Sequence, residues 1–160
     1  MNELNPCVQE HYAMKSICFG CGPANEKGLR IRSFESNDDK GPNLIATWSP
    51  EPHHQAFPGV LNGGIVGALL DCHGNWAASM HLMRKTQLKE PPCTVTADFS
   101  VQLRRPCPVD KPIYLTARVV QAGDTKASVE AELICDGKIC STLKGTFVAV
   151  APSHPAYHRW

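Results

Sequence analysis

A short stretch near the middle of the chain combines residue types that can carry out acyl chemistry. Asn62, a preferred helix N-cap residue, precedes Gly63-Gly64 and a long apolar run. At a helix start, backbone N–H groups lack intrahelical acceptors and the helix dipole favours negative charge, so these glycines can stabilise an oxyanion. The apolar run carries a single carboxylate, Asp71. A lone acid among apolar residues is costly without a partner or a chemical role, which makes Asp71 the candidate base.

Both features also have a purely structural interpretation. Asp71 can be a buried acid that is satisfied by Asn75 or by an amide of a partner chain. The Gly63-Gly64 pair can serve close packing of a helix against a strand, although two glycines at a cap cost backbone entropy. The sequence therefore leaves these alternatives open beside the catalytic one.

Further polar and small residues can complete a substrate site around the acid. The hydroxyl of Thr96 can position a water molecule from a neighbouring strand. His54 precedes the glycine motif, although histidines in such positions are more typical of loops or satisfied cores. A paired arginine motif at a strand end can bind the phosphates of coenzyme A or simply be solvated. The candidate substrate-binding residues are His54, Gly67, Asn75, Arg104 and Arg105.

Composition limits the classes of function. The 160 residues are 42% hydrophobic and 19% charged, which is typical of one globular domain. The net charge of +1 gives no electrostatic case for binding nucleic acid or a membrane surface. Residues 1–7 lack the basic start and apolar run of a signal peptide, and no stretch is apolar enough to span a bilayer. We therefore expect a cytoplasmic protein.

Eight cysteines are best interpreted as reduced thiols in such a protein. Cys18 and Cys21 form a C-x-x-C pair, which with Cys7 and His11 could provide a tetrahedral zinc set. The second pair expected at zinc-finger spacing is missing, and the adjacent glycines suit a plain tight turn. We therefore predict a cysteine-bearing turn with no metal and no cofactor. The cysteines expected to be small core residues are Cys72, Cys93, Cys135 and Cys140.

The pattern of the chain predicts an α+β fold in which an antiparallel sheet of five or six strands wraps around one long central helix. The helix begins after Asn62 and runs to about Met83, and it is apolar on nearly every face. One curved sheet covers only part of such a helix, so we expect its far side to pack against a second copy. Three parts are expected: an N-terminal segment (1–28), the main domain (29–150) and a tail (151–160). The predicted strands cover residues 29–36, 44–48, 94–104, 112–121, 126–135 and 139–150.

Three motifs follow one another along residues 18–150: Cys18-Phe19-Gly20-Cys21-Gly22-Pro23-Ala24-Asn25 with Gly28-Leu29, His54-Gln55 through Leu69-Leu70-Asp71, and Val95-Thr96-Ala97-Asp98-Phe99-Ser100-Val101 reaching Arg104-Arg105-Pro106. Together they resemble the motifs of hotdog-fold thioesterases of the PaaI-like type. The resemblance implies hydrolysis of acyl-CoA thioesters by a homodimer, or by a dimer of dimers, with the active site between subunits. The chain departs from the family pattern in two places: Asn62 replaces the usual His before Gly-Gly, and Cys72 replaces the frequent Glu after Asp71.

Helix geometry independently favours a shared site. Gly64 and Asp71 would lie roughly 10 Å apart along one helix axis, too far to act on the same carbonyl. Two antiparallel helices from two chains can bring the donor of one to the base of the other. The expected function is thioester hydrolysis in which Asp71 activates water or, alternatively, attacks directly. The other hypotheses are an acyl-thioester hydratase or dehydratase of the same fold and a non-catalytic acyl-CoA-binding module.

Overall fold

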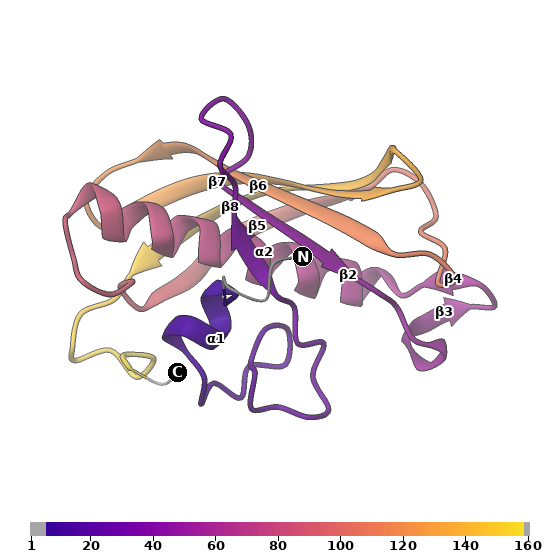
Figure 1. The fold of residues 1–160 in the computed structure, drawn as a ribbon, viewed down its shortest axis with the longest axis horizontal. Coiled ribbons are helices and arrows are strands. Elements are labelled where there is room, and N and C mark those ends of the chain that lie inside the picture. The colour runs from indigo at the N-terminus through magenta and orange to yellow at the C-terminus, as the bar shows by residue number, and fades with distance from the viewer. Residues whose placement is uncertain (1–5, 159–160) are drawn as a thin grey trace.

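The computed structural model describes residues 6–158 and contains one antiparallel sheet that curves around one long helix (Figure 1). Residues 1–5, which carry most of the segment tested for a signal peptide, and the last two residues of the predicted tail lie outside the described part. The predicted α+β architecture is confirmed. The sheet order is β1-β2-β6-β7-β8-β5, built from β1 (Ser33–Glu35), β2 (Leu44–Trp48), β5 (Thr94–Leu103), β6 (Ile113–Ala122), β7 (Lys126–Cys135) and β8 (Lys138–Ala149).

The central helix α2 spans Gly63–Lys85, close to the predicted bounds. The side chain of Asn62 caps its start by accepting hydrogen bonds from the N–H groups of Gly64 (2.8 Å) and Ile65 (3.2 Å). At its end, the hydroxyl of Thr86 donates to the carbonyl of Leu82 at 2.7 Å. Although α2 is long, none of the described helices is apolar enough over its length to cross a membrane.

Local turn chemistry sets the strand pairing. Between β7 and β8, Asp136 and Gly137 both have positive φ values, 51° and 69°, as a tight hairpin with right-handed twist requires. Along β7 buried and more exposed residues alternate, so that Val129, Ala131 and Leu133 enter the core beneath α2. The strand has the predicted bounds of 126–135, and its alternation reflects its packing.

The first strand is shorter than predicted because its first residues hydrogen-bond to a loop and not to a neighbouring strand. The N–H of Leu29 donates to the carbonyl of Phe19 at 2.7 Å, and that of Ile31 donates to the carbonyl of Gly20 at 3.1 Å. Only Ser33–Glu35 therefore pair with β2. Small elements that the sequence did not predict are α1 (Val8–Tyr12), the 3₁₀ turn Pro52–His54, β3 (Gln55–Phe57) and β4 (Val60–Leu61).

The N-terminal segment lies on the side of α2 that faces away from the sheet (Figure 1). The indole N–H of Trp76 donates to the sulfur of Cys21 at 3.4 Å, and Gly20 lies directly against Cys72. Much of the far side of α2 is therefore covered by the chain itself. This corrects the expectation that a second copy is needed to cover it, so the apolar surface of α2 does not by itself require a dimer.

A buried polar network fixes this segment to the core. His73 is fully buried on α2, and its Nε2 lies 3.2 Å from the carbonyl of Leu44, which can only accept a hydrogen bond. The proton is therefore on Nε2, and Nδ1 accepts from the hydroxyl of Ser33 at 2.8 Å. Gln9 of α1 donates to the same hydroxyl oxygen at 2.9 Å. The network joins α1, β1, β2 and α2, and within residues 6–158 no buried side-chain nitrogen or oxygen lacks a hydrogen-bond partner.

Candidate active site

Asp71 is held by the edge strand β5. The hydroxyl of Thr96 donates to Oδ1 of Asp71 at 2.7 Å. One turn further along α2, the amide of Asn75 donates to the carbonyl of Thr94 at 3.2 Å, and the hydroxyl of Thr94 donates back to Oδ1 of Asn75. From Asp71 to Asn75 the helix rises about 6 Å, and from Thr96 to Thr94 the strand spans about 6.6 Å. The two helix–strand contacts therefore have matching spacings. The acid is thus positioned by regular structure on both sides.

A β-bulge lies beside this contact. In the pairing of β5 with β8, Thr96 is opposite Phe147 and Asp98 is opposite Thr146, which leaves Ala97 as the extra residue. Bulges re-aim side chains and often lie near active sites. Here the bulge begins directly after Thr96, the residue whose hydroxyl reaches Asp71.

Asp71 and Asn75 open into a pocket of about 140 Å³ between α2, β5 and the N-terminal loop. Burial raises the pKa of Asp71 above its usual value, and the hydrogen bond from Thr96 partly offsets this effect. The carboxylate is therefore only partly solvated and has a stronger basicity than a surface acid. The lining residues are Ser16, Cys18, Cys21, Asp71, Cys72, Asn75, Trp76, Ser79 and Thr94.

The two helix-start glycines differ in what they can donate. The N–H of Gly64 is occupied by the Asn62 cap. Within the described residues, the N–H of Gly63 has no acceptor, so it is the donor that remains for an oxyanion. Gly63 lies eight residues before Asp71 on the same helix, which is about 12 Å along the axis. Neither glycine lines the pocket that contains Asp71.

The remaining predicted substrate residues are distributed unequally. Gly67 lies on an open part of α2, where an added Cβ would meet nothing within 4 Å. His54 is buried away from the Asp71 pocket, where its Nδ1 accepts from the N–H of Glu51 at 2.9 Å and its ring packs against Trp48. Arg104 and Arg105 are exposed, and Arg104 contacts Gln102 at 2.8 Å. The structure therefore brings together Asp71, Asn75 and Thr96 but gives His54 a local structural contact.

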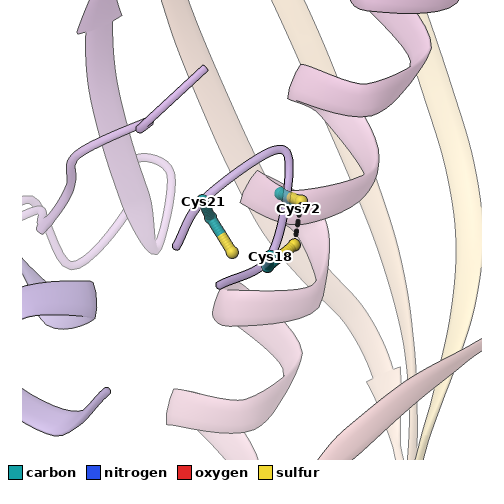
Figure 2. Close-up of side chains that lie close together, drawn as sticks. All are labelled: Cys18, Cys21 and Cys72. Carbon is teal, nitrogen blue, oxygen red and sulfur yellow. Dashed lines mark hydrogen bonds between the residues drawn. The ribbon is translucent and has the colours of Figure 1, made fainter. Parts of the chain in front are cut away.

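Three cysteine side chains lie close together (Figure 2), and all three line the pocket. The sulfurs of Cys18, Cys21 and Cys72 all lie within 4.8 Å of one another, and those of Cys18 and Cys72 are 3.8 Å apart. Hydrogen bonds from the two neighbouring thiols lower the pKa of Cys18. The contact with Cys18 raises the pKa of Cys21, and the contacts with Cys18 and Cys21 raise that of Cys72, so any thiolate in the reduced cluster forms first at Cys18.

This cluster differs from the sequence-based one in its members. Among the described residues, Cys7 and His11 do not join Cys18 and Cys21 in a group that could hold a metal ion, whereas Cys72 does. The interpretation of Cys72 as a plain core residue is therefore wrong, because the N-terminal loop brings two thiols onto its side of α2. Cys93, Cys135 and Cys140 are buried as expected.

Comparison with known proteins agrees with this architecture. Residues 58–141, more than half of the chain, match the family model described as "Thioesterase superfamily". The chain belongs to the thioesterase superfamily. Membership supports a thioester hydrolase activity, and the sheet wrapped around one helix is the predicted hotdog fold. No curated protein matches the sequence significantly.

Solved thioesterase structures share the fold at low sequence identity. A thioesterase superfamily protein from Shewanella loihica PV-4 is 26% identical, with a TM-score of 0.63 over 81% of this chain and 98% of its own. A phenylacetic acid degradation-related protein from Ralstonia eutropha JMP134 is 21% identical, with a TM-score of 0.65 over 81% and 92% of the two chains. A thioesterase from Haemophilus influenzae is 19% identical, with a TM-score of 0.63 over 81% and 84%. The last two comparisons support the fold alone.

Within this thioesterase fold, sequence reasoning missed the helix face that lines the pocket beside the acid. Cys72, Trp76 and Ser79 recur at the spacing of one helical stripe, and the hydroxyl of Ser79 donates to the carbonyl of Pro92 at 2.7 Å. This i, i+4, i+7 spacing is visible in the sequence. It predicts that the three side chains share a face, but it does not tell which segment covers that face.

Proposed function

We propose that the protein hydrolyses acyl-CoA thioesters with Asp71 as the general base. The supporting observation is the contact between Asp71 and Thr96 at the rim of a pocket, because it orients a partly desolvated carboxylate toward space that a substrate and a water molecule can enter. Asp71 takes a proton as water attacks the thioester carbonyl carbon. The carbon–sulfur bond then breaks, and the leaving thiolate receives that proton to give the free acid and the thiol.

The proposed oxyanion donor is the N–H of Gly63 of the partner subunit. In one chain, Gly63 and Asp71 are about 12 Å apart along α2, so they cannot act on the same carbonyl. The ten-residue strand β5 is an edge strand of the sheet, and its Phe99 and Leu103 are 47% and 60% exposed. A long edge strand with unpaired backbone groups and two exposed large apolar side chains favours pairing with another chain. We therefore propose a homodimer with a site at each end of the shared edge.

Two other functions make different demands on the same site. An acyl-thioester hydratase or dehydratase would need a histidine beside the acid, whereas in the described residues Asp71 bonds to Thr96, and His54 and His73 are engaged elsewhere. An acyl-CoA-binding module would need the pocket but not the base. Exposed Arg104 and Arg105 fit either role as contacts for coenzyme A phosphates.

The deciding experiment measures free thiol released from a panel of short, medium, long and aromatic acyl-CoAs by purified protein. Thiol release that is lost in Asp71→Asn supports the proposal. Binding of the same acyl-CoAs without any thiol release would identify a binding module. Conversion of an enoyl-CoA to a hydroxyacyl-CoA, with the thioester intact, would identify a hydratase.

A further inference from the structure

The three cysteine sulfurs beside Asp71 form a group that the proposed hydrolysis does not use. Two come from the N-terminal loop, Cys18 and Cys21, and one comes from the central helix, Cys72 (Figure 2). Cys72 is more than fifty residues from the loop pair in sequence, yet each sulfur lies within 4.8 Å of the other two. Thiols gathered this closely without disulfide bonds are typical of soft-metal ligands.

We propose that Cys18, Cys21 and Cys72 bind one zinc ion. Four ligands at about 2.3 Å around a tetrahedral zinc would place neighbouring sulfurs about 3.8 Å apart. The sulfurs of Cys18 and Cys72 are 3.8 Å apart, whereas a disulfide would need about 2.05 Å. The thiols lose their protons to solvent when the ion binds. The sequence favoured a turn without metal because the second pair expected at zinc-finger spacing is missing and the adjacent glycines suit a tight turn.

The loop that carries two of these ligands is shaped for close approach to α2. The N–H of Gly22 donates to the carbonyl of Cys18 at 2.8 Å, which folds the C-x-x-C pair so that both thiols face one side. A Cβ on Gly20 would lie only 2.3 Å from the sulfur of Cys72. Glycine at this position therefore allows the loop to bring its thiols to the helix.

A donor outside the cluster supports the charge of bound thiolates. The indole N–H of Trp76 donates to the sulfur of Cys21 at 3.4 Å. Such outer hydrogen bonds orient metal ligands, and removing one typically weakens metal affinity by about 10–100-fold. All three cysteines also line the pocket, so a water molecule there can supply the fourth ligand. The inference depends on the cluster alone and stands apart from the proposed hydrolysis.

The experiment measures zinc content and affinity of the full chain, purified and reduced, by elemental analysis and competition with a chromogenic chelator. We expect one zinc per chain, and cobalt substitution should give thiolate charge-transfer bands with the visible bands of a tetrahedral site. Cys72→Ala and the more exposed Cys18→Ser should each lose stoichiometric metal. Trp76→Phe should bind zinc about 10–100-fold more weakly.

Matched controls separate this site from the set suggested by sequence. Cys7→Ala removes a buried cysteine of the N-terminal segment that lies outside the cluster, and Cys107→Ala removes a core cysteine. Both should keep one zinc per chain. Reduced wild-type protein that takes up no zinc would overturn the proposal, even if it forms a disulfide on exposure to air. Retention of metal by both Cys72→Ala and Cys18→Ser would overturn it as well.

Discussion

The hydroxyl of Thr96 donates a hydrogen bond of 2.7 Å to the Oδ1 of Asp71, joining the edge strand to the central helix. Asn75 and Thr94 repeat the contact one turn away. Because each pair comes from regular structure, the position of the acid depends on the register between α2 and β5 rather than on a flexible loop. Two substitutions test what this contact contributes.

Asp71→Asn keeps the size of the side chain and its ability to accept a hydrogen bond from Thr96, but it removes the base. We expect hydrolysis to fall at least about 100-fold, the lower range for general-base catalysis, with little change in melting temperature. Thiol release and thermal unfolding should be measured together. Asp39→Asn, which changes an exposed acid in a turn, is the control and should retain activity. Near-normal turnover by Asp71→Asn would exclude this residue as the base.

Thr96→Val removes the hydroxyl while nearly preserving the shape of the side chain. We expect kcat to fall by about 10-fold or more, because Asp71 loses the donor that orients it, and the KM for an acyl-CoA to change less. Thr96→Ser restores a hydroxyl and should recover most of the rate. If serine and valine at this position behave alike, the hydroxyl has no positioning role.

A shared active site predicts complementation between two inactive chains. Gly63→Pro removes the proposed donor at the first helical position, where proline is tolerated, and the ψ of 131° at Asn62 suits the residue before a proline. Mixing this variant with Asp71→Asn, after proven subunit exchange, should restore about a quarter of wild-type activity, since half of the dimers then contain one intact site. An inactive mixture of folded, exchanging subunits would contradict the shared site.

The buried histidine predicts a loss of stability in acid. Burial lowers the pKa of His73 from its usual value of 6.5 to about 4. Below pH 6.5 the unfolded chain therefore binds this proton more readily than the folded chain does. The free energy of unfolding should decrease as pH falls from about 6.5 to about 4. Below about pH 4 this histidine should cause no further decrease. Urea unfolding across this range measures the slope. An NMR titration in which the His73 ring gains its proton near pH 6.5 would refute the assignment.

Gly20→Ala tests the close approach of the N-terminal loop to α2. The added Cβ would lie 2.3 Å from the sulfur of Cys72, so either the loop or the helix must shift. We expect a cost of about 1–3 kcal/mol, which corresponds to a melting temperature lower by roughly 3–9 °C. Gly67→Ala is the matched control. It lies in the helix with open space at its Cβ, and it should be neutral or stabilising by up to about 1 kcal/mol.

Sequence reasoning succeeded where the signal is local. The strand at 126–135 was predicted with its observed bounds, and the Asp-Gly turn that directly follows it is a local hairpin signal. The start of the central helix followed from its Asn62 cap. The first strand was overextended because Leu29 and Ile31 hydrogen-bond to a distant loop.

The site itself was only partly predictable. Thr96 was expected near the acid, but the register of β5 against β8 shifts at a bulge at Ala97, which no sequence pattern predicted. Cys72 was misinterpreted because its neighbours come from a segment some fifty residues earlier. The packing of the N-terminal segment over α2 was missed for the same reason, because an apolar helix face does not indicate which segment buries it.

The contact between Gly20 and Cys72 means that substitutions at these two positions cannot have additive effects. Replacing Cys72 with alanine removes the sulfur that an alanine at position 20 would strike, so in metal-free protein the double variant should be more stable than the sum of the two single changes allows. A double-mutant cycle would report this as a favourable coupling free energy between the N-terminal loop and the helix. The side-chain volumes at positions 20 and 72 are therefore coupled. A larger residue in the loop can be accommodated only with a smaller one on the helix.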